Sequence, residues 1–344
     1  VLDGLPGGVR IDEEYIAQVM EKRKASGTIS TPRKEADKVT SLSGVKDGYA
    51  EGTPICMVIE NTNVHSKDYS ELEHTARPGH ADYTAHIKYD GYEDPRGGGH
   101  FSGRLTAPIV ACGAVALSML KTKGITIGTH IQSLHGIQDT HFTQDNLSAQ
   151  IASLNEKQFP VLDDVQGSKM IEEIEKARMA QDSVGGVLQT VILGLEPGIG
   201  ETEFYSMESG LAHGLFSSPA VKGVEFGDGF ALADMFGSEA NDPFAIQDGN
   251  VVTTSNHNGG INGGISNGMP VMFNTCIKPT PSISKQQKTV NFVTKQDKTL
   301  EIHGRHDPAI IHRARIVVDA ISALTVVDYL MERYGREYFK GENS

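Results

Sequence analysis

Two short segments carry residue types that could bind a small anion and move protons on it. Residues 77–82 read Arg-Pro-Gly-His-Ala-Asp, and residues 96–104 read Arg-Gly-Gly-Gly-His-Phe-Ser-Gly-Arg. Arginine forms forked hydrogen bonds with carboxylate and phosphate oxygens, and glycine lets the main chain approach such a group closely. Histidine can exchange a proton near neutral pH. The segments predict a site for a small polyanion that undergoes acid–base chemistry, although alone they could also form a turn and a loop with solvated arginines.

The composition is typical of a soluble globular protein and limits the kinds of partner. The chain has 344 residues and a net charge of −13, which argues against a nucleic-acid-binding surface. Apolar runs stay well short of the roughly 18 uninterrupted residues that span a bilayer, and the first residues lack a signal-peptide pattern. We therefore expect a cytoplasmic protein with no membrane partner. Three scattered cysteines indicate neither a disulfide framework nor a metal site.

Helix and strand patterns mix without a regular βαβ period, which indicates an α+β fold in a single domain, residues 1–344. Helices are expected at residues 12–24, 106–121, 167–182, 200–216 and 309–335. Strands are expected at 55–59, 125–134, 186–195 and 270–278, with a Gly/Asn-rich loop at 255–268. The helix at 106–121 follows the glycine-rich segment directly, so its N-terminus would add partial positive charge beside a bound anion.

Six motifs in chain order closely resemble those of chorismate synthase, and the resemblance runs nearly end to end. They are the two segments above, Val-Lys-Gly-Val-Glu-Phe-Gly-Asp-Gly at 221–229, Ser-Asn-His-Asn-Gly-Gly-Ile-Asn-Gly-Gly at 255–264, Lys-Pro-Thr-Pro-Ser at 278–282 and Gly-Arg-His-Asp-Pro at 304–308. The resemblance implies a fold of helices sandwiched between antiparallel β-sheets, assembled as a homotetramer. In that family a Gly-Glu-Ser-His-Gly segment with a first catalytic histidine precedes the stretch that matches Asp3–Gly8, so we expect it upstream of Val1.

The resemblance also implies a reaction. Chorismate synthases convert 5-enolpyruvylshikimate 3-phosphate to chorismate by a 1,4-elimination of phosphate in the shikimate pathway. They require reduced FMN as a transient electron donor, although the reaction has no net redox change. The implied substrate-binding residues are Arg23, Arg33, Arg77, Ser102, Gly103 and Arg104. From the sequence alone, Arg23 and Arg33 could equally be solvated charges.

Two residues are implied to manage protons, and a further set to hold the flavin. His80 would protonate reduced flavin, and Asp307 would relay a proton near flavin N5, although Asp307 could also cap the helix that follows it. The FMN-binding residues implied by the resemblance are Arg33, Asn258, Gly259, Lys278, Ser282, Arg305, His306 and Asp307. No metal is expected.

Four positions depart from the family pattern. His100 stands in place of an arginine, Phe101 of a serine and Leu105 of a glutamate, and Asp319 lies where a glutamate is usual. These departures raise a second hypothesis, a catalytically degenerate paralogue that binds FMN or an anion without turnover. Some fungal relatives reduce their own flavin with NADPH. This chain has no Gly-x-Gly-x-x-Gly motif after an expected strand, so we expect it to depend on an external flavin reductant.

Overall fold

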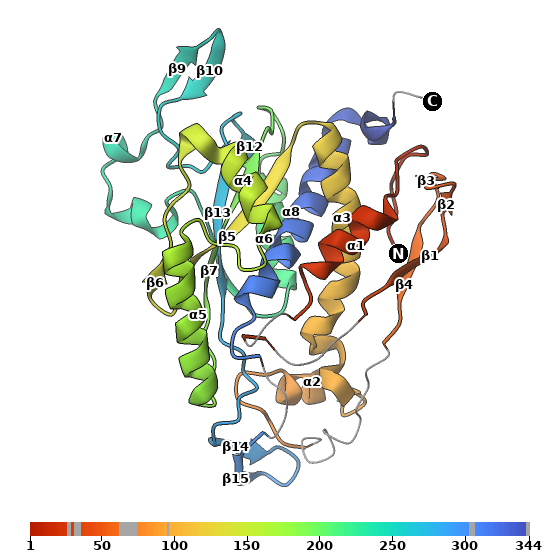
Figure 1. The fold of residues 1–344 in the computed structure, drawn as a ribbon, viewed down its shortest axis with the longest axis vertical. Coiled ribbons are helices and arrows are strands. Elements are labelled where there is room, and N and C mark those ends of the chain that lie inside the picture. Colours follow the sequence, from red (N-terminus) through yellow and green to blue (C-terminus); the bar gives the residue numbers. More distant parts are fainter. Residues whose placement is uncertain (26–28, 31–35, 62–73, 95, 303–306, 342–344) are drawn as a thin grey trace.

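A five-stranded antiparallel sheet forms the centre of the molecule (Figure 1). The computed structural model describes residues 1–344 except 26–28, 31–35, 62–73, 95, 303–306 and 342–344. The strands are, in spatial order, β6 (Ile137–Gln138), β5 (Thr126–Leu134), β7 (Gly186–Leu193), β13 (Val271–Ile277) and β8 (Val221–Phe226). Alternate residues of β13 are buried and the residues between them are half-buried or exposed, so one face of the sheet is turned to the core.

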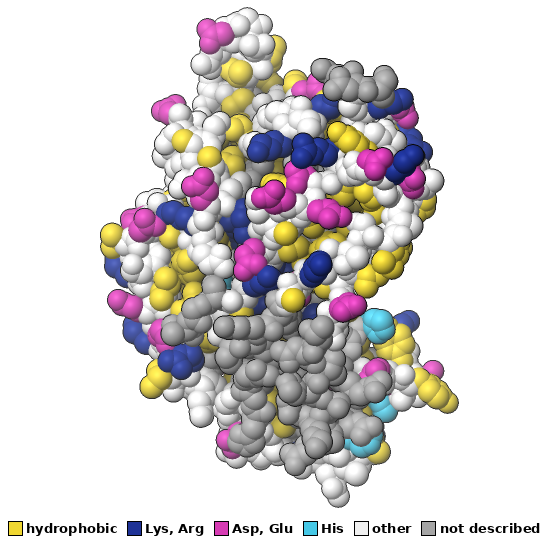
Figure 2. Space-filling view, turned by 45° about the vertical axis from the view of Figure 1, so that its right-hand side comes forward, with side chains coloured by type: hydrophobic (Ala, Val, Ile, Leu, Met, Phe, Trp, Pro, Cys, Tyr) yellow, Lys and Arg dark blue, Asp and Glu magenta, His cyan; other side chains and the backbone are white. Residues whose placement is uncertain are grey.

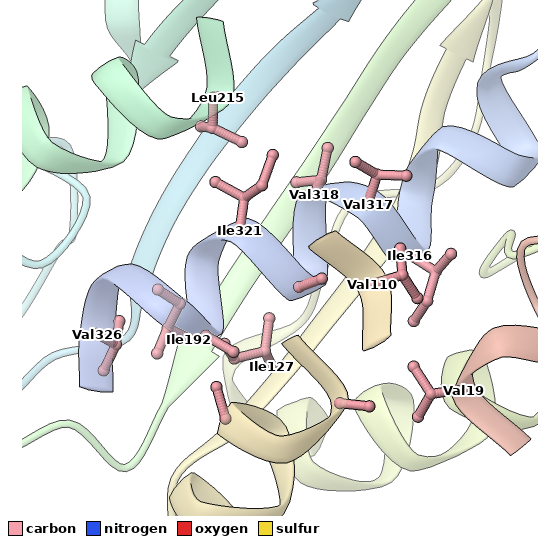
Figure 3. Packing of buried hydrophobic residues seen from close by; sticks show 14 of the residues in the cluster. Val19, Val110, Ile127, Ile192, Leu215, Ile316, Val317, Val318, Ile321 and Val326 are labelled. Carbon is pink, nitrogen blue, oxygen red and sulfur yellow. The ribbon is translucent and has the colours of Figure 1, made fainter. Parts of the chain in front are cut away.

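Helices cover this buried face. The long helix α8 (Ile311–Tyr334) packs on β5 and β7 and also against α3 (Thr106–Thr122). Figure 3 shows Ile127 and Ile192, from the sheet, and Val110, from α3, around the same stretch of α8. Their burial forms the main hydrophobic core.

A second, smaller sheet lies on the far side of the helices. It is the antiparallel ribbon of β1 (Val39–Ser43) and β4 (Cys56–Ile59), which lies against α1 (Glu13–Glu21) and α3 (Figure 1). Asp12 begins α1 by accepting a hydrogen bond from the main-chain N–H of Tyr15 at 3.0 Å. The helices are therefore enclosed between antiparallel sheets, which confirms the α+β sandwich.

Three further helices pack on the sheet and α8. On the opposite face of β5, α4 (Leu147–Glu156) lies close because Gly128 has no side chain where Ile151 packs. α5 (Asp164–Met179) lies beside β6, and α6 (Met207–Ser217) packs on α8 and β8.

The remaining elements are short and lie toward the edges of the fold. Figure 1 shows the β9–β10 hairpin projecting from the body of the molecule, with α7 nearby. These elements are α2 (Asp82–Lys88), α7 (Gly237–Ala240), β2 (Val45–Lys46) with β3 (Tyr49–Ala50), β9 (Phe244–Gln247) with β10 (Asn250–Thr253), β11 (Ile261–Asn262) with β12 (Ile265–Ser266), and β14 (Gln287–Asn291) with β15 (Gln296–Leu300).

The expected elements are present, with three informative differences. α5 begins at Asp164, earlier than expected, because the Asp163 side chain accepts from the main-chain N–H of Val165 and caps the helix there. α6 begins only at Met207, where Ser206 caps it. The strand at 56–59 is not the buried strand that its apolar run indicates, because its ribbon has two strands and leaves these side chains half-buried or exposed.

Among the residues that the structure describes, one segment, Gly103–Thr122, is long and apolar enough to cross a membrane by length and composition. It consists of α3 and its lead-in, and 56% of the most apolar stretch is buried inside the protein. The packing of α3 against α8 accounts for its apolar composition.

Candidate functional site

The turn at residues 77–82 is organised by one carboxylate. Asp82, the first residue of α2, accepts hydrogen bonds from Arg77 main-chain N at 2.9 Å, Nε at 2.9 Å and Nη2 at 2.6 Å. Burial alone would raise the pKa of Asp82, but the hydrogen bonds and charge of Arg77, together with His80, outweigh this and hold the pKa far below its usual range. Asp82 is therefore ionised and fixes the Arg77 guanidinium in one orientation.

The same pair holds one side of the His80 ring. His80 Nδ1 lies 3.1 Å from Arg77 Nη2 and 3.1 Å from Asp82 Oδ1. All three side chains are largely buried. Because Nδ1 faces this pair, Nε2, on the opposite side of the ring, is the nitrogen turned away from it. Figure 2 shows histidine side chains grouped low on one face, in the part where Figure 1 places α2.

This turn docks on the segment that follows β13. Lys278 Nζ donates to the main-chain carbonyl of Gly79 at 2.5 Å, and Arg77 Nη1 lies 3.5 Å from Ser282 Oγ. Gly79 has φ +71, a backbone conformation that favours glycine, and it lies in contact distance of Pro281. The side chains of Arg77, Lys278 and Ser282 therefore meet beside His80. All three are predicted to bind anions, and they come from segments about 200 residues apart.

The second predicted segment forms a tight lead-in to α3. Ser102 Oγ accepts a hydrogen bond from the main-chain N–H of Arg104 at 3.2 Å, and Arg104 Nη1 donates to Asn61 Oδ1 at 2.9 Å. Gly103 has open space where a side chain would stand. The three predicted substrate residues thus occupy the turn from which α3 begins, as the sequence indicates.

Arg23 lies behind this lead-in and is 4% exposed. Its guanidinium donates to Asp37, to Thr106 and to the carbonyls of Gly103 and Arg104. Arg23 is therefore not the solvated charge that the sequence left open, because it is buried and bonded within the protein. Its role in substrate binding stays a prediction.

Asp307 precedes α8 and is paired with an arginine that the sequence reasoning missed. Arg313 Nη1 donates to Asp307 Oδ2 at 2.8 Å, and Arg313 Nε donates to the main-chain carbonyl of Arg23 at 2.9 Å. The 307–313 spacing exceeds one helical turn and spans the start of α8, so no helical periodicity relates the two residues.

The Asn258–Gly259 segment lies at the other end of β13. Gly259 main-chain O accepts from the N–H of Met272, whereas Lys278 follows Ile277 at the opposite end of the strand. Seven residues of β-strand span about 20 Å. Asn258 donates through its main-chain N and Nδ2 to Asp242, each at 2.9 Å. This part of the predicted FMN set is therefore not brought beside His80 within one chain.

Three predicted residues, Arg33, Arg305 and His306, lie outside the described residues. The departures from the family pattern fall in two places. Phe101 and Leu105 are exposed beside the α3 lead-in, whereas Asp319 is buried in the core. Asp319 accepts from Arg315 at 2.9 Å and from Thr129 at 2.5 Å, and burial raises its pKa.

Comparison with known proteins gives one consistent result. A family model described as chorismate synthase matches residues 1–331. A chorismate synthase of Thermococcus kodakarensis is 42% identical over 333 residues, covering 97% of this chain and 92% of that protein. One of Lachnoclostridium phytofermentans is 46% identical over 336 residues, covering 96% and 89%. A crystal structure of a chorismate synthase superposes with a TM-score of 0.74 at 25% identity, covering 97% of this chain and 87% of that one.

Proposed function

Because the chain belongs to the chorismate synthase family, and is thereby a carbon–oxygen lyase of the shikimate pathway, we propose that it works by a reduced-FMN-dependent mechanism. Its reaction would be the 1,4-elimination of phosphate from 5-enolpyruvylshikimate 3-phosphate. One contact supports the site proposal most directly: the turn with Arg77 and His80 docks on Lys278 and Ser282.

The substrate carries a phosphate and two carboxylates, so the chain must supply several cationic donors. We assign substrate binding to Arg77, Ser102, Gly103, Arg104 and Arg33. Arg23, which lies behind the loop, belongs to the same set. The charge of Arg77 is already balanced by Asp82, so Arg77 would contribute directed hydrogen bonds rather than net positive charge. Each charge-assisted hydrogen bond contributes about 1.5–3 kcal/mol, so several together offset the desolvation of such an anion.

The donor groups near His80 fit the phosphate of FMN. The ammonium of Lys278 lies at the Gly79 carbonyl, and the hydroxyl of Ser282 lies 3.5 Å from Arg77 Nη1, so both groups stand beside the His80 turn. The chemistry that reduced FMN supplies when bound is transient electron donation, which helps to expel phosphate. We assign Arg305 and His306 to the same cofactor, together with Arg33.

His80 and Asp307 are the proposed proton-handling groups. Arg77 and Asp82 occupy the Nδ1 side of His80, so Nε2 is the atom that would exchange a proton in the site. Arg313 keeps the Asp307 carboxylate in one orientation, from which it would accept and pass on a proton. Flavin reduction would come from an external reductant.

A homotetramer is the proposed assembly, with residues 1–344 as a single domain in the cytoplasm. The main core cluster has members from Leu5 to Phe339, which supports the one-domain assignment. Large apolar side chains on and near the β9–β10 hairpin support an oligomer, among them Phe230 at 86% and Phe236 at 78% exposed. In an oligomer, a second copy could bring its Asn258–Gly259 segment to the FMN site.

The proposal is tested with full-length protein, dithionite-reduced FMN and the enolpyruvyl substrate under anaerobic conditions, following chorismate absorbance and phosphate release. We expect turnover that falls by at least about 100-fold in His80→Ala and Asp307→Ala. Lys24→Ala, in the turn after α1, should retain it. FMN binding without phosphate release would instead support the degenerate paralogue.

A further inference from the structure

Arg23 is bonded on several sides by the protein itself. Its Nη1 donates to Asp37 Oδ2 at 2.7 Å, and both side chains are buried. Its Nε donates to Thr106 Oγ1 at 3.1 Å. Its Nη2 donates to the main-chain carbonyls of Gly103 at 3.3 Å and Arg104 at 3.2 Å. A guanidinium with this many acceptors in fixed directions orients its neighbours as much as it is oriented by them.

These contacts fix the turn that carries Ser102. Holding the carbonyls of Gly103 and Arg104 sets the planes of the two peptide groups that follow them. The N–H of Arg104 lies in the first of these planes and donates to Ser102 Oγ at 3.2 Å. Thr106 Oγ1 donates to the Gly103 carbonyl at 2.6 Å and reinforces the same arrangement. Because Ser102 Oγ serves as acceptor here, its O–H is left to donate to an anion.

Arg313 connects this unit to Asp307. One edge of its guanidinium donates from Nε to the Arg23 carbonyl at 2.9 Å, and Nη1 donates to Asp307 Oδ2 at 2.8 Å. Both donors belong to one rigid plane, so the position of the carboxylate is tied to the main chain of Arg23. A lysine would keep the charge but would lose this planar pair of donors.

We propose that Arg23 and Arg313 form an arginine brace, a pair of positioning residues that holds Asp307 and the Ser102–Arg104 turn in one mutual arrangement. The effect of the brace on catalysis rests on the proposed function. Arg23 then acts on the substrate through Ser102 and Arg104. Arg23 follows the C-terminal end of α1 and Arg313 lies in the first turn of α8, so the brace also joins these helices at the site.

Amide hydrogen exchange tests the first half of the brace without any activity measurement. The main-chain N–H groups of Arg104 and Leu105 both donate to Ser102, so their exchange reports the order of the turn. We expect Arg23→Lys to speed their exchange by at least about 10-fold. The matched control, Lys24→Ala, removes an exposed pair with Glu21 and should leave it unchanged.

Unchanged exchange in Arg23→Lys would overturn the brace. Should Arg23→Lys fail to fold, Thr106→Val takes its place, because it removes the Nε acceptor and the donor to Gly103 while keeping the side-chain shape. The same result is expected, and the same null result would overturn the brace.

A double-mutant cycle tests the second half. We expect Arg313→Lys to lower kcat by about 10- to 100-fold in the native background, with substrate Kd, measured with oxidised FMN, changed by less than about 3-fold. In the Asp307→Asn background the same change should cost less than about 3-fold in kcat, because the residue that it positions is already lost.

The outcomes separate the two proposals. Equal losses in both backgrounds, or a loss expressed in substrate Kd, would overturn the positioning role of Arg313. Absence of turnover in the native protein, with faster exchange in Arg23→Lys, would overturn the proposed function and leave the brace standing as a structural unit.

Discussion

Three of the described arginines at the candidate site are paired with carboxylates: Arg77 with Asp82, Arg23 with Asp37, and Arg313 with Asp307. The local positive charge is therefore smaller than the arginine count of the sequence indicates, and recognition depends on which N–H edges remain turned to the ligand. Asp82 could have been found from the sequence, since it belongs to the same motif as Arg77. Asp37 and Arg313 could not, because only the fold brings them to their partners.

His312 gives a prediction about pH at the scale of one residue. It is buried, its Nε2 lies 2.7 Å from Ser30 Oγ, and burial, with the charge of Arg313, lowers its pKa to about 3. The folded pKa lies below the unfolded value of about 6.5, so the folded state loses stability as pH falls through 6.5. At 1.36 kcal/mol per pH unit, this residue accounts for about 2 kcal/mol lost between pH 7 and pH 5.

His312→Gln should remove that part of the pH dependence while keeping a hydrogen-bonding group near Ser30. Urea unfolding at pH 7 and pH 5 measures it: the native protein should lose about 2 kcal/mol more than the variant between these values. Equal losses would show that His312 does not bind a proton on unfolding.

At the scale of secondary-structure elements, the contact between α3 and α8 holds both ends of the candidate site. α3 begins at the Ser102–Arg104 turn, and α8 begins after Asp307 and carries Arg313. The small, apolar residues at 106–121 predicted a closely packed helix, and the structure confirms it. The partner helix could not be identified from the sequence, because periodicity shows that a face is buried but not against what.

Gly113 makes this contact testable. A Cβ there would overlap Ala320 of α8, so Gly113→Ala must separate the helices despite the better helix propensity of alanine. We expect a loss of about 1–3 kcal/mol in the free energy of unfolding, measured in urea, together with a lower kcat.

Gly237→Ala is the matched control, because nothing lies within contact distance of a Cβ at that position and its backbone is not in the left-handed region. It should change the free energy of unfolding by less than about 0.5 kcal/mol. A Gly113→Ala protein as stable as this control would contradict the close packing of α3 on α8.

At the scale of the whole molecule, the fold class and most helices and strands were predicted from the sequence. The structure adds the position of each motif relative to the others in space. The 77–82 turn and the 278–282 segment meet at the Ile277 end of β13, while the Asn258–Gly259 segment lies at the Val271 end. The linear order of motifs carries no information on which end of a strand each one reaches. A site that takes residues from both ends would require a second copy of the chain.

The exposed aromatic residues give the prediction at this scale. Phe236, beside α7, is largely exposed, as is Phe244 at the start of the β9–β10 hairpin. If these side chains are buried between copies, Phe236→Asp should dissociate the assembly, as sedimentation velocity would show, with the monomer still folded by circular dichroism.

Phe204 is also largely exposed but lies far from the hairpin in the sequence, so Phe204→Asp is the variant with which Phe236→Asp is compared. A native protein that sediments as a monomer, or a Phe236→Asp protein that keeps the native assembly, would contradict an interface at the hairpin.

The central claim is that this chain eliminates phosphate with reduced FMN, and one measurement tests it most directly. Phosphate and chorismate are quantified after anaerobic incubation of the full-length protein and 5-enolpyruvylshikimate 3-phosphate with either reduced or oxidised FMN. We predict equal amounts of the two products with reduced FMN and neither with oxidised FMN. FMN binding with no phosphate released in either case, or equal release in both, would contradict the account.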